Sequence, residues 1–442
     1  ALSFKMLGVG LVQGRLVMVG YILLAAAGLY AVGRQLHGSG AATVAILLFA
    51  STTQAGPFAH GRHLLGEIPA LAFLYWGVAL FVAARSDGRD RSHLGAGLLF
   101  GLAILTKNQF ALLVPLVLGL WLLGFVRRSG FSVRQLLLVL VAMVAPTALW
   151  SAFQFWSLGP AEYAEHLRQM SIEAAASAYM SPLARALAGG KFLVASGFAT
   201  WGAVGLAYVW LLAFREKRWL EPGWVLLPAF ALLWLGWYVG FSTGWVRYAV
   251  PAVVTCNLFL AKLLCDLGTT FGSLARRGAE SQVRALAANP PGTALLAVMA
   301  MMVLSGIAVN AEAIARAADR SPLQFATIVA ERVAAEAVVE GSEWEIDFLT
   351  GRAFVHPPFS VVMDGISAVS QGKGGETVRR YRVSPAASYL VDGPFSKLAG
   401  IYRSELSRGE FQQIASVGEY DLYRRTTVRS LSLEQGGEDG SG

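Results

Sequence analysis

Apolar runs of membrane-spanning length alternate with short polar loops along the first 311 residues. Ten runs are predicted to be membrane spans: 15–33, 41–57, 68–84, 94–106, 109–126, 136–157, 191–214, 223–243, 246–266 and 293–311. The chain is 55% hydrophobic and only 14% charged, whereas a soluble domain carries about a quarter charged residues. We therefore predict an α-helical polytopic membrane protein of about ten spans.

The pattern changes after residue 311, where most of the acidic residues of the chain are found. The runs "FSVVMDG", "ASYLVDG" and "YDLYRR" resemble strands and are separated by Gly, Pro and Ser. Three domains are predicted: a transmembrane domain over 1–311, a small extramembrane α/β-like domain over 312–430, and a disordered tail over 431–442.

Basic residues indicate which loops face the cytoplasm. Thirteen Lys and Arg residues lie in one alternate set of loops, and six lie in the other set. The thirteen are in loops 34–40, 85–93, 127–135, 215–222 and 267–292. By the positive-inside rule these loops are cytoplasmic, so the opposite loops and the C-terminal domain face outward. The net charge of +8 is thus a topology signal, and nucleic-acid binding is not expected.

Three ionisable residues lie at the outward ends of spans, where charge is costly unless it anchors a helix or does chemistry. Glu67 stands in a first helical turn, where the helix dipole alone favours a carboxylate, but it could also bind a metal or an acceptor hydroxyl. Lys107, in "LTKNQ", is either an ordinary loop lysine or the partner of a phosphate. Arg247, beside Tyr248, is either a snorkelling anchor or a bidentate ligand of a lipid phosphate.

Two further outward segments carry weaker signals. Arg62 and His63 precede Glu67, and His63 with Glu67 would supply ligands for a divalent metal, although no third ligand is defined. The loop 158–190 has apolar residues at helical spacing, which predicts an amphipathic helix in the membrane interface. That segment is either a binding element or an inert connector.

Several segments together resemble the GT-C glycosyltransferases that use polyprenyl-phosphate sugars, such as the bacterial aminoarabinose transferases and the protein mannosyltransferases. The segments are "GRLVMVGYILLAAAGLYAVGRQLHGSGAATVAILLFA", "GRHLLGEIPALAFLYWGVALF", "GLLFGLAILTKNQFALLVPL" and "VRYAVPAVV", the last similar to an RY-x-x-P pattern. The resemblance covers most of residues 1–311, and more weakly "DFLTGRAFVHPP" and "ASYLVDGPFSKLAGIY".

This resemblance implies an enzyme of the bacterial inner (plasma) membrane that moves a sugar from a polyprenyl-phosphate donor to a lipid, glycan or protein hydroxyl on the outer face. It implies that Arg62, Lys107, Arg247 and Tyr248 bind the lipid phosphate or the sugar, and that Glu67 is a catalytic residue. In the family, the general base is an Asp in the first outward loop. Upstream of residue 15 the sequence "ALSFKMLGVGLVQG" has no acidic residue, so we expect the chain to be an N-terminally truncated sequence whose base lies upstream.

A transporter or flippase of lipid-linked sugars is the alternative. Transporters place charged or interrupted helices near the bilayer midplane, whereas the spans here are almost free of acidic residues and the polar groups gather at the outer edge. This difference favours a glycosyltransferase. The identity of the sugar and of the acceptor cannot be predicted from the sequence.

Overall fold

The computed structural model describes residues 5–6, 8, 10–53, 56–61, 65–87, 89–126, 132–175, 182–195, 202–242, 244–276, 290–315, 319–370 and 381–426. The chain divides into two compact units, Ala1–Arg316 and Ala317–Gly442. The predicted tail 431–442 lies outside the described residues. Each unit is considered by itself below.

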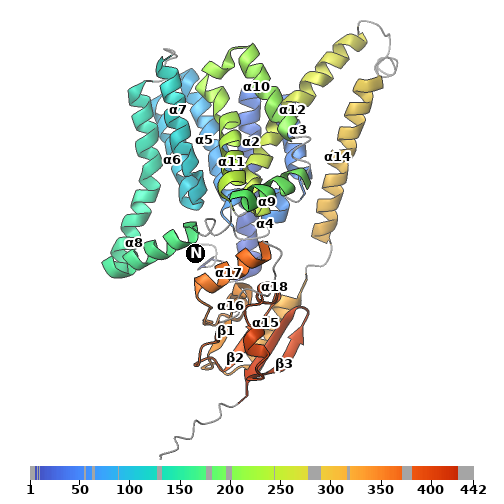
Figure 1. The fold of residues 1–442 in the computed structure, drawn as a ribbon. Coiled ribbons are helices and arrows are strands. Elements are labelled where there is room, and N and C mark those ends of the chain that lie inside the picture. Colours follow the sequence, from blue (N-terminus) through green and yellow to red (C-terminus); the bar gives the residue numbers. More distant parts are fainter. Residues whose placement is uncertain are drawn as a thin grey trace, which may run out of the picture. The chain divides into compact units, whose positions relative to one another are not determined.

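All the secondary-structure elements described in the first unit are helices (Figure 1). Its elements are α2 (Leu11–His37), α3 (Ser39–Ser51), α4 (Pro57–Gly61), α5 (Glu67–Asp87), α6 (Asp90–Thr106), η1 (Asn108–Leu112), α7 (Leu113–Val126), α8 (Val133–Ala175), α9 (Pro182–Ala195), α10 (Gly202–Arg215), η3 (Arg218–Leu220), α11 (Pro222–Phe241), α12 (Val246–Arg276) and α14 (Pro290–Ala315). Among the described helices, five are long and apolar enough to cross a membrane, and four shorter helices are also apolar. The polytopic helical prediction is confirmed.

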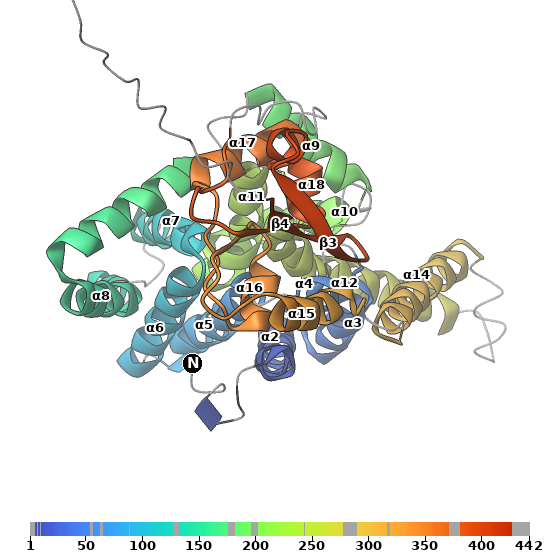
Figure 2. The same ribbon diagram turned by 90° about the horizontal axis from the view of Figure 1, so that it is seen from below.

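Small residues let these helices pack at close range. A Cβ atom at Gly97 or Gly101 of α6 would lie 2.3 Å from the carbonyl oxygen of Val139 or Met143 in α8. These glycines are four residues apart, the spacing that brings membrane helices together along one face. Figure 2 shows the resulting row in which α6 lies between α5 and α8.

The apolar run 191–214, predicted as one span, carries parts of two described helices, α9, which ends at Ala195, and α10, which begins at Gly202. Residues 196–201, between these two helices, lie outside the described residues.

The second unit is a four-stranded sheet with helices. Its elements are α15 (Ser321–Arg332), β1 (Val339–Gly341), α16 (Trp344–Thr350), α17 (Phe359–Ser370), β2 (Tyr389–Asp392), α18 (Pro394–Ala399), α19 (Arg403–Leu406), β3 (Phe411–Val417) and β4 (Tyr420–Arg425). The strand order is β1-β2-β4-β3, with β1 parallel to β2 and the other neighbours antiparallel. The small α/β-like fold agrees with the sequence prediction.

Two of the three predicted strands are present, in "ASYLVDG" as β2 and in "YDLYRR" as β4. The strand expected at "FSVVMDG" is wrong, because these residues begin helix α17. In α17 the buried and half-buried positions 361, 365, 368 and 369 recur at helical spacing. Gly365 also packs closely against Ala399 of α18, since a Cβ there would lie 2.8 Å from the Ala399 Cβ.

Candidate functional site

The two charged residues at the ends of α5 and α6 form an ion pair. Nζ of Lys107 lies 2.8 Å from Oε1 of Glu67. The Glu67 side chain is fully buried, and the Lys107 side chain is 17% exposed. Apart from this ion pair, neither carboxylate oxygen of Glu67 has a hydrogen-bond partner among the described residues. The pair therefore provides a buried carboxylate with one oxygen still able to accept a hydrogen bond.

Local sequence explains why these two residues meet. A Cβ at Gly66 would lie only 2.4 Å from the carbonyl oxygen of Thr106, so the glycine lets the start of α5 touch the end of α6. Lys107 then leaves the helix in an extended conformation (φ −150°, ψ 107°), and η1 begins with the next residue. Phe110 fixes this turn, because its buried ring packs against Trp234 of α11 at a centroid distance of 4.7 Å. The connection between the predicted spans 94–106 and 109–126 is thus an extended residue followed by a short 3₁₀ helix.

The start of α12 adds a second cation and two aromatic rings. The guanidinium carbon of Arg247 lies 4.4 Å from the ring centroid of Trp245 and 5.1 Å from that of Tyr248. Those rings stack with an angle of 7° between their planes. Nζ of Lys107 lies 5.1 Å from the Tyr248 ring centroid, so Tyr248 contacts both cations.

Hydrogen bonds from α11 hold this turn in place. The indole of Trp234 donates to the carbonyl oxygen of Tyr248 at 2.7 Å, and the hydroxyl of Tyr238 donates to that of Gly244 at 3.0 Å. The backbone N–H of Gly244, a residue with a positive φ of 75°, donates to the hydroxyl oxygen of Ser242. The aromatic residues of α11 thus anchor the backbone that carries Tyr248.

The electrostatic balance of the cluster is positive. Lys107 is neutralised by Glu67, but no carboxylate pairs with Arg247 in the described part of the chain. Among the described residues its guanidinium donates one hydrogen bond, to the Tyr248 hydroxyl at 3.4 Å, and its buried Nε has no partner there. Oε1 of Gln109, two residues beyond Lys107, is also buried and has no partner in the described part of the chain. Buried polar atoms without partners are rare in folded proteins and mark places where a ligand or water completes the bonding.

The structure therefore brings together four of the six residues selected from the sequence: Glu67, Lys107, Arg247 and Tyr248. Arg62 and His63 lie outside the described residues. Within the described ranges no three His, Cys, Asp or Glu residues are close enough to hold a metal ion. Sequence reasoning missed Gly66 and Trp234, which position the charged groups without carrying charge themselves.

We compared the chain with known protein families and curated protein sequences. Residues 1–150, about a third of the chain, match the sequence profile of the family described as dolichyl-phosphate-mannose-protein mannosyltransferase. No curated protein sequence matches the chain.

Solved structures match over almost the whole chain. ArnT from Cupriavidus metallidurans bound to undecaprenyl phosphate has a TM-score of 0.59 at 14% identity, over 96% of this chain and 85% of that one. The oligosaccharyltransferase of Archaeoglobus fulgidus tethered to an acceptor peptide has a TM-score of 0.57 at 12% identity, over 96% of this chain and 65% of that one. The archaeal oligosaccharyltransferase AglB of Archaeoglobus fulgidus with an inhibitory peptide and a dolichol-phosphate has a TM-score of 0.53 at 14% identity, over 94% and 63%. At these identities the likeness establishes the fold, which is the GT-C fold.

Proposed function

We propose that this chain, which has the GT-C fold, is a membrane glycosyltransferase that takes its sugar from a polyprenyl-phosphate-linked donor. The observation that carries the proposal is the Arg247 guanidinium, which lies against two aromatic rings beside the Glu67–Lys107 pair and has no carboxylate partner among the described residues. Such a cation suits a lipid phosphate, because a guanidinium binds phosphate oxygens in a bidentate manner. The match of residues 1–150 to a dolichyl-phosphate-mannose family supports the same donor class.

In the proposed reaction the oxygen of an acceptor hydroxyl attacks the anomeric carbon of the donor sugar. The bond between that carbon and the phosphate oxygen breaks, and the polyprenyl phosphate leaves with the bonding electron pair. Arg247 and Lys107 stabilise the charge that develops on the leaving phosphate. The acceptor is a hydroxyl of a lipid, a glycan or a protein, and the sugar is a hexose or a pentose.

Glu67 has a holding role in this proposal. Its free oxygen accepts a hydrogen bond from the acceptor or the sugar, while its other oxygen keeps Lys107 beside Tyr248. The general base that takes the hydroxyl proton is an acidic residue outside the described ranges, as the family resemblance implies. No step is assigned to a metal, since the described residues offer no set of ligands beyond Glu67.

The proposed location is the bacterial inner membrane, with the site and the C-terminal unit on the outer side. The membrane is the one that the family resemblance implies, and the outward side rests on the distribution of Lys and Arg between the two sets of loops.

Replacing Arg247 by Gln tests the proposal. The full chain in phospholipid vesicles is supplied with a polyprenyl-phosphate-linked sugar, and released polyprenyl phosphate is measured together with direct binding of undecaprenyl phosphate. We expect Arg247→Gln to weaken binding of undecaprenyl phosphate and to lower transfer at least about 100-fold, which corresponds to about 3 kcal/mol. Arg215→Gln, at an exposed position at the end of α10, is the control and leaves both unchanged.

Two results would contradict the proposal. If undecaprenyl phosphate binds the Arg247→Gln variant as tightly as it binds the unaltered chain, the guanidinium does not bind the lipid phosphate. Movement of the lipid-linked sugar across the vesicle membrane without transfer would identify a transporter instead.

A further inference from the structure

Helix α8 changes surroundings along its length. Near its start Arg134 pairs with Asp90 of α6, at the end that the basic loops assign to the cytoplasm. Its next turns pack closely on α6 through Gly97 and Gly101. A helix needs about 20 residues to cross the roughly 30 Å hydrocarbon core of a bilayer. Counted from Leu136, such a crossing ends near Phe155.

The outer half of this crossing has little protein cover. Leu149 is 72% exposed and Trp156 is 83% exposed, and Trp150 and Phe153 are also exposed. The rings of Trp150 and Phe153 stack with centroids 5.5 Å apart. Exposed aromatic residues at the end of a span are typical of the membrane–water interface. Residues 150–156 thus mark the outer edge of the hydrocarbon layer.

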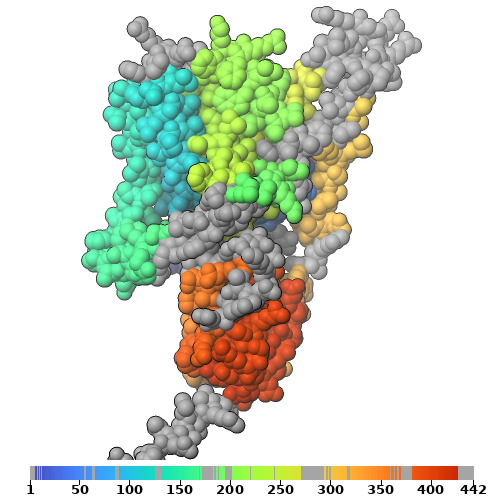
Figure 3. All heavy atoms as spheres, viewed as in Figure 1, coloured from blue at the N-terminus to red at the C-terminus, as the bar shows by residue number. Residues whose placement is uncertain are grey.

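The helix turns immediately beyond that edge. Gly159 has φ 79° and ψ 166°, which interrupts the helix, and Pro160 begins the next helical stretch. The rings of Phe155 and Tyr163 meet edge to face across the turn, with centroids 5.7 Å apart. Figure 1 shows the sharp bend at the lower end of α8, and in Figure 3 the part beyond it projects from the helical unit. We name residues 160–171 the outer leg.

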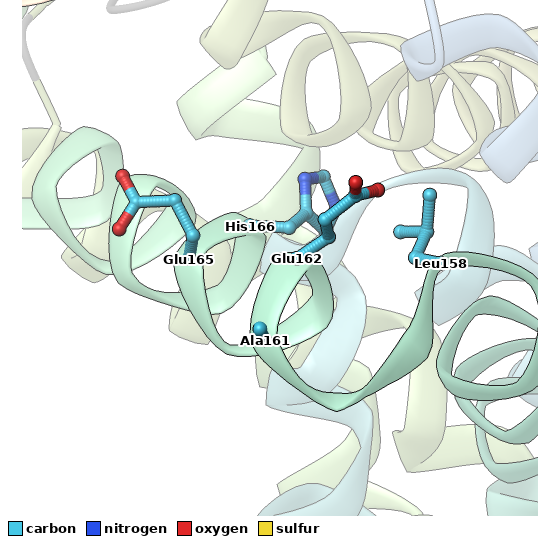
Figure 4. Close-up of a pocket in the computed structure, with 5 residues that line it drawn as sticks. All are labelled: Leu158, Ala161, Glu162, Glu165 and His166. Carbon is cyan, nitrogen blue, oxygen red and sulfur yellow. The ribbon is translucent and has the colours of Figure 1, made fainter.

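The outer leg is amphipathic. Tyr163, Leu167 and Met170 recur at i, i+4 and i+7 and share one face, with Leu167 47% and Met170 39% exposed. The other side carries Glu165 and Arg168, which form an ion pair at 2.6 Å. The inner side of the bend holds an open hollow of about 460 Å³ lined by Leu158, Ala161, Glu162, Glu165 and His166, and Figure 4 shows Glu162 and His166 pointing into the same space above the helix.

We propose that the outer leg is an interfacial helix that lies in the outer headgroup layer and binds the lipid surface through Tyr163, Leu167 and Met170. Its apolar face continues the lipid-facing surface of the crossing, and the turn at Gly159 is at the depth where the hydrocarbon layer ends. The occupant is the bilayer itself. The inference stands independently of the proposed enzymatic function.

Charge defines which lipids suit this surface. Arg168 is already paired with Glu165, and Glu162 adds a further negative charge. The outer leg therefore has no basic surplus for anionic headgroups. Its binding comes from buried apolar area and does not depend on anionic lipid.

Site-directed spin labelling of the full chain in phosphatidylcholine vesicles tests the proposal. Labels replace Leu167 and Met170 on the apolar face, and Ala161 and Glu165 on the opposite side, in a chain whose Cys256 and Cys265 are changed to Ser. The ratio of collision rates with oxygen and with a water-soluble nickel chelate is expected to be at least about tenfold higher at the first two positions. A label at Leu149 gives the lipid reference, and one at Gln412 of β3, which is exposed, gives the water reference. Replacing a third of the lipid by phosphatidylglycerol is expected to change the ratios less than about twofold.

Three results overturn the proposal: equal ratios at all four positions, low collision rates with both reagents at 167 and 170, or a difference that appears only with phosphatidylglycerol. The turn is tested separately. Gly159→Ala, which disfavours the positive φ, is expected to move the label at 167 to the water value, whereas Gly190→Ala in α9, where a Cβ meets no atom within 4 Å, leaves it unchanged. Should Gly159→Ala fail to fold, Met170→Ser with the label at 167 replaces it, and an unchanged oxygen preference at 167 would then contradict the role of the apolar face.

Discussion

Two fully buried glutamates, Glu67 in the helical unit and Glu340 in the C-terminal unit, differ in the partners of their carboxylate oxygens. Glu340 accepts a hydrogen bond of 2.6 Å from the hydroxyl of Tyr381 and one of 2.7 Å from the backbone N–H of Ser384, one on each oxygen. Glu67 has only the ion pair with Lys107, and its second oxygen has no partner in the described part of the chain.

This difference distinguishes Glu340, a structural carboxylate, from Glu67, a carboxylate that can still bind a ligand. A buried charge is tolerated when every oxygen has a donor, as at Glu340, where the surrounding strands and loops supply both. At Glu67 the neighbouring helices supply a countercharge but leave bonding capacity unused. The Glu67 surroundings therefore suit a polar substrate, whereas those of Glu340 leave nothing for one to bind.

The largest effect is expected from Lys107→Met, which leaves Glu67 buried without a countercharge. Breaking a buried pair from one side costs about 3–5 kcal/mol in the free energy of unfolding, and we expect sugar transfer to fall at least about 100-fold. Unfolding in detergent and transfer in vesicles are the measurements.

The double variant Glu67→Gln with Lys107→Met is the control, since it removes both charges. Most of the lost stability should return while transfer stays low. A single variant that loses less than about 1 kcal/mol would show that the pair is solvated like a surface ion pair.

The charged members of this site were predictable because charge is scarce at the ends of membrane spans. Glu67, Lys107 and Arg247 stand out for that reason, and the alternation of basic loops assigns them to one side. Their contact could not be derived, because it depends on how tightly α5 approaches α6 at Gly66 and on the packing of Phe110 against Trp234. Such approaches are set by tertiary packing.

The fold shows a similar division. Long apolar runs predict helices well, but apolar content does not reveal how many helices share a run: 191–214, predicted as one span, holds the end of α9 and most of α10. In the C-terminal unit, β-branched residues in "FSVVMDG" favour a strand locally, while packing against α18 selects a helix. Short strands such as β1, with three residues, carry too little pattern to be recognised.

The next largest effect is expected from widening the close contact between α5 and α6 that brings Glu67 and Lys107 together. Gly66→Ala places a methyl group 2.4 Å from the Thr106 carbonyl oxygen, so α5 and α6 must separate. We expect a loss of about 1–3 kcal/mol in stability and a transfer rate about tenfold lower, equivalent to about 1.4 kcal/mol. Gly119→Ala in α7, where a Cβ meets nothing within 4 Å, is the matched control and keeps full activity. Equal activity of the two variants would show that the approach of the helices does not limit the site.

The structural carboxylate is tested by Tyr381→Phe, which removes one of the two donors to Glu340. A lost hydrogen bond to a buried charge costs about 1.5–3 kcal/mol, and this loss should appear in amide hydrogen exchange of β1 and β2 with transfer unchanged. In a Glu340→Gln background the same change should cost less than about 1 kcal/mol, because the charge is gone. A fall in transfer with intact hydrogen exchange would mean that the C-terminal unit takes part in the reaction.

Asp392, at the end of β2, provides the most pH-dependent effect. The residue is 6% exposed, stands directly opposite Asp421 in the sheet register, and has one oxygen without a hydrogen-bond partner among the described residues. Burial raises the pKa of Asp392 to about 6, with the hydrogen bond from Ser396 and the charge of Lys397 opposing the shift and the nearby Asp421 adding to it. Burial also raises the pKa of Glu343. Because the folded pKa lies above the unfolded value near 3.9, the folded state binds the extra proton.

Stability should therefore fall as the pH rises through the folded pKa of Asp392. We expect the β2 amides to lose about 2 kcal/mol of protection between pH 4.5 and 7.5, after correction for intrinsic exchange. Asp392→Asn should flatten this slope and raise protection at pH 7.5, leaving the smaller contribution of Glu343. Asp319→Asn is the control: hydrogen bonds from Ser321 lower the pKa of Asp319, so its titration lies below this range and the slope should persist. If the protection of the β2 amides falls as steeply with pH in Asp392→Asn, other groups bind the proton. Unpaired carboxylate oxygens in the C-terminal unit would then be as well tolerated as the paired ones of Glu340.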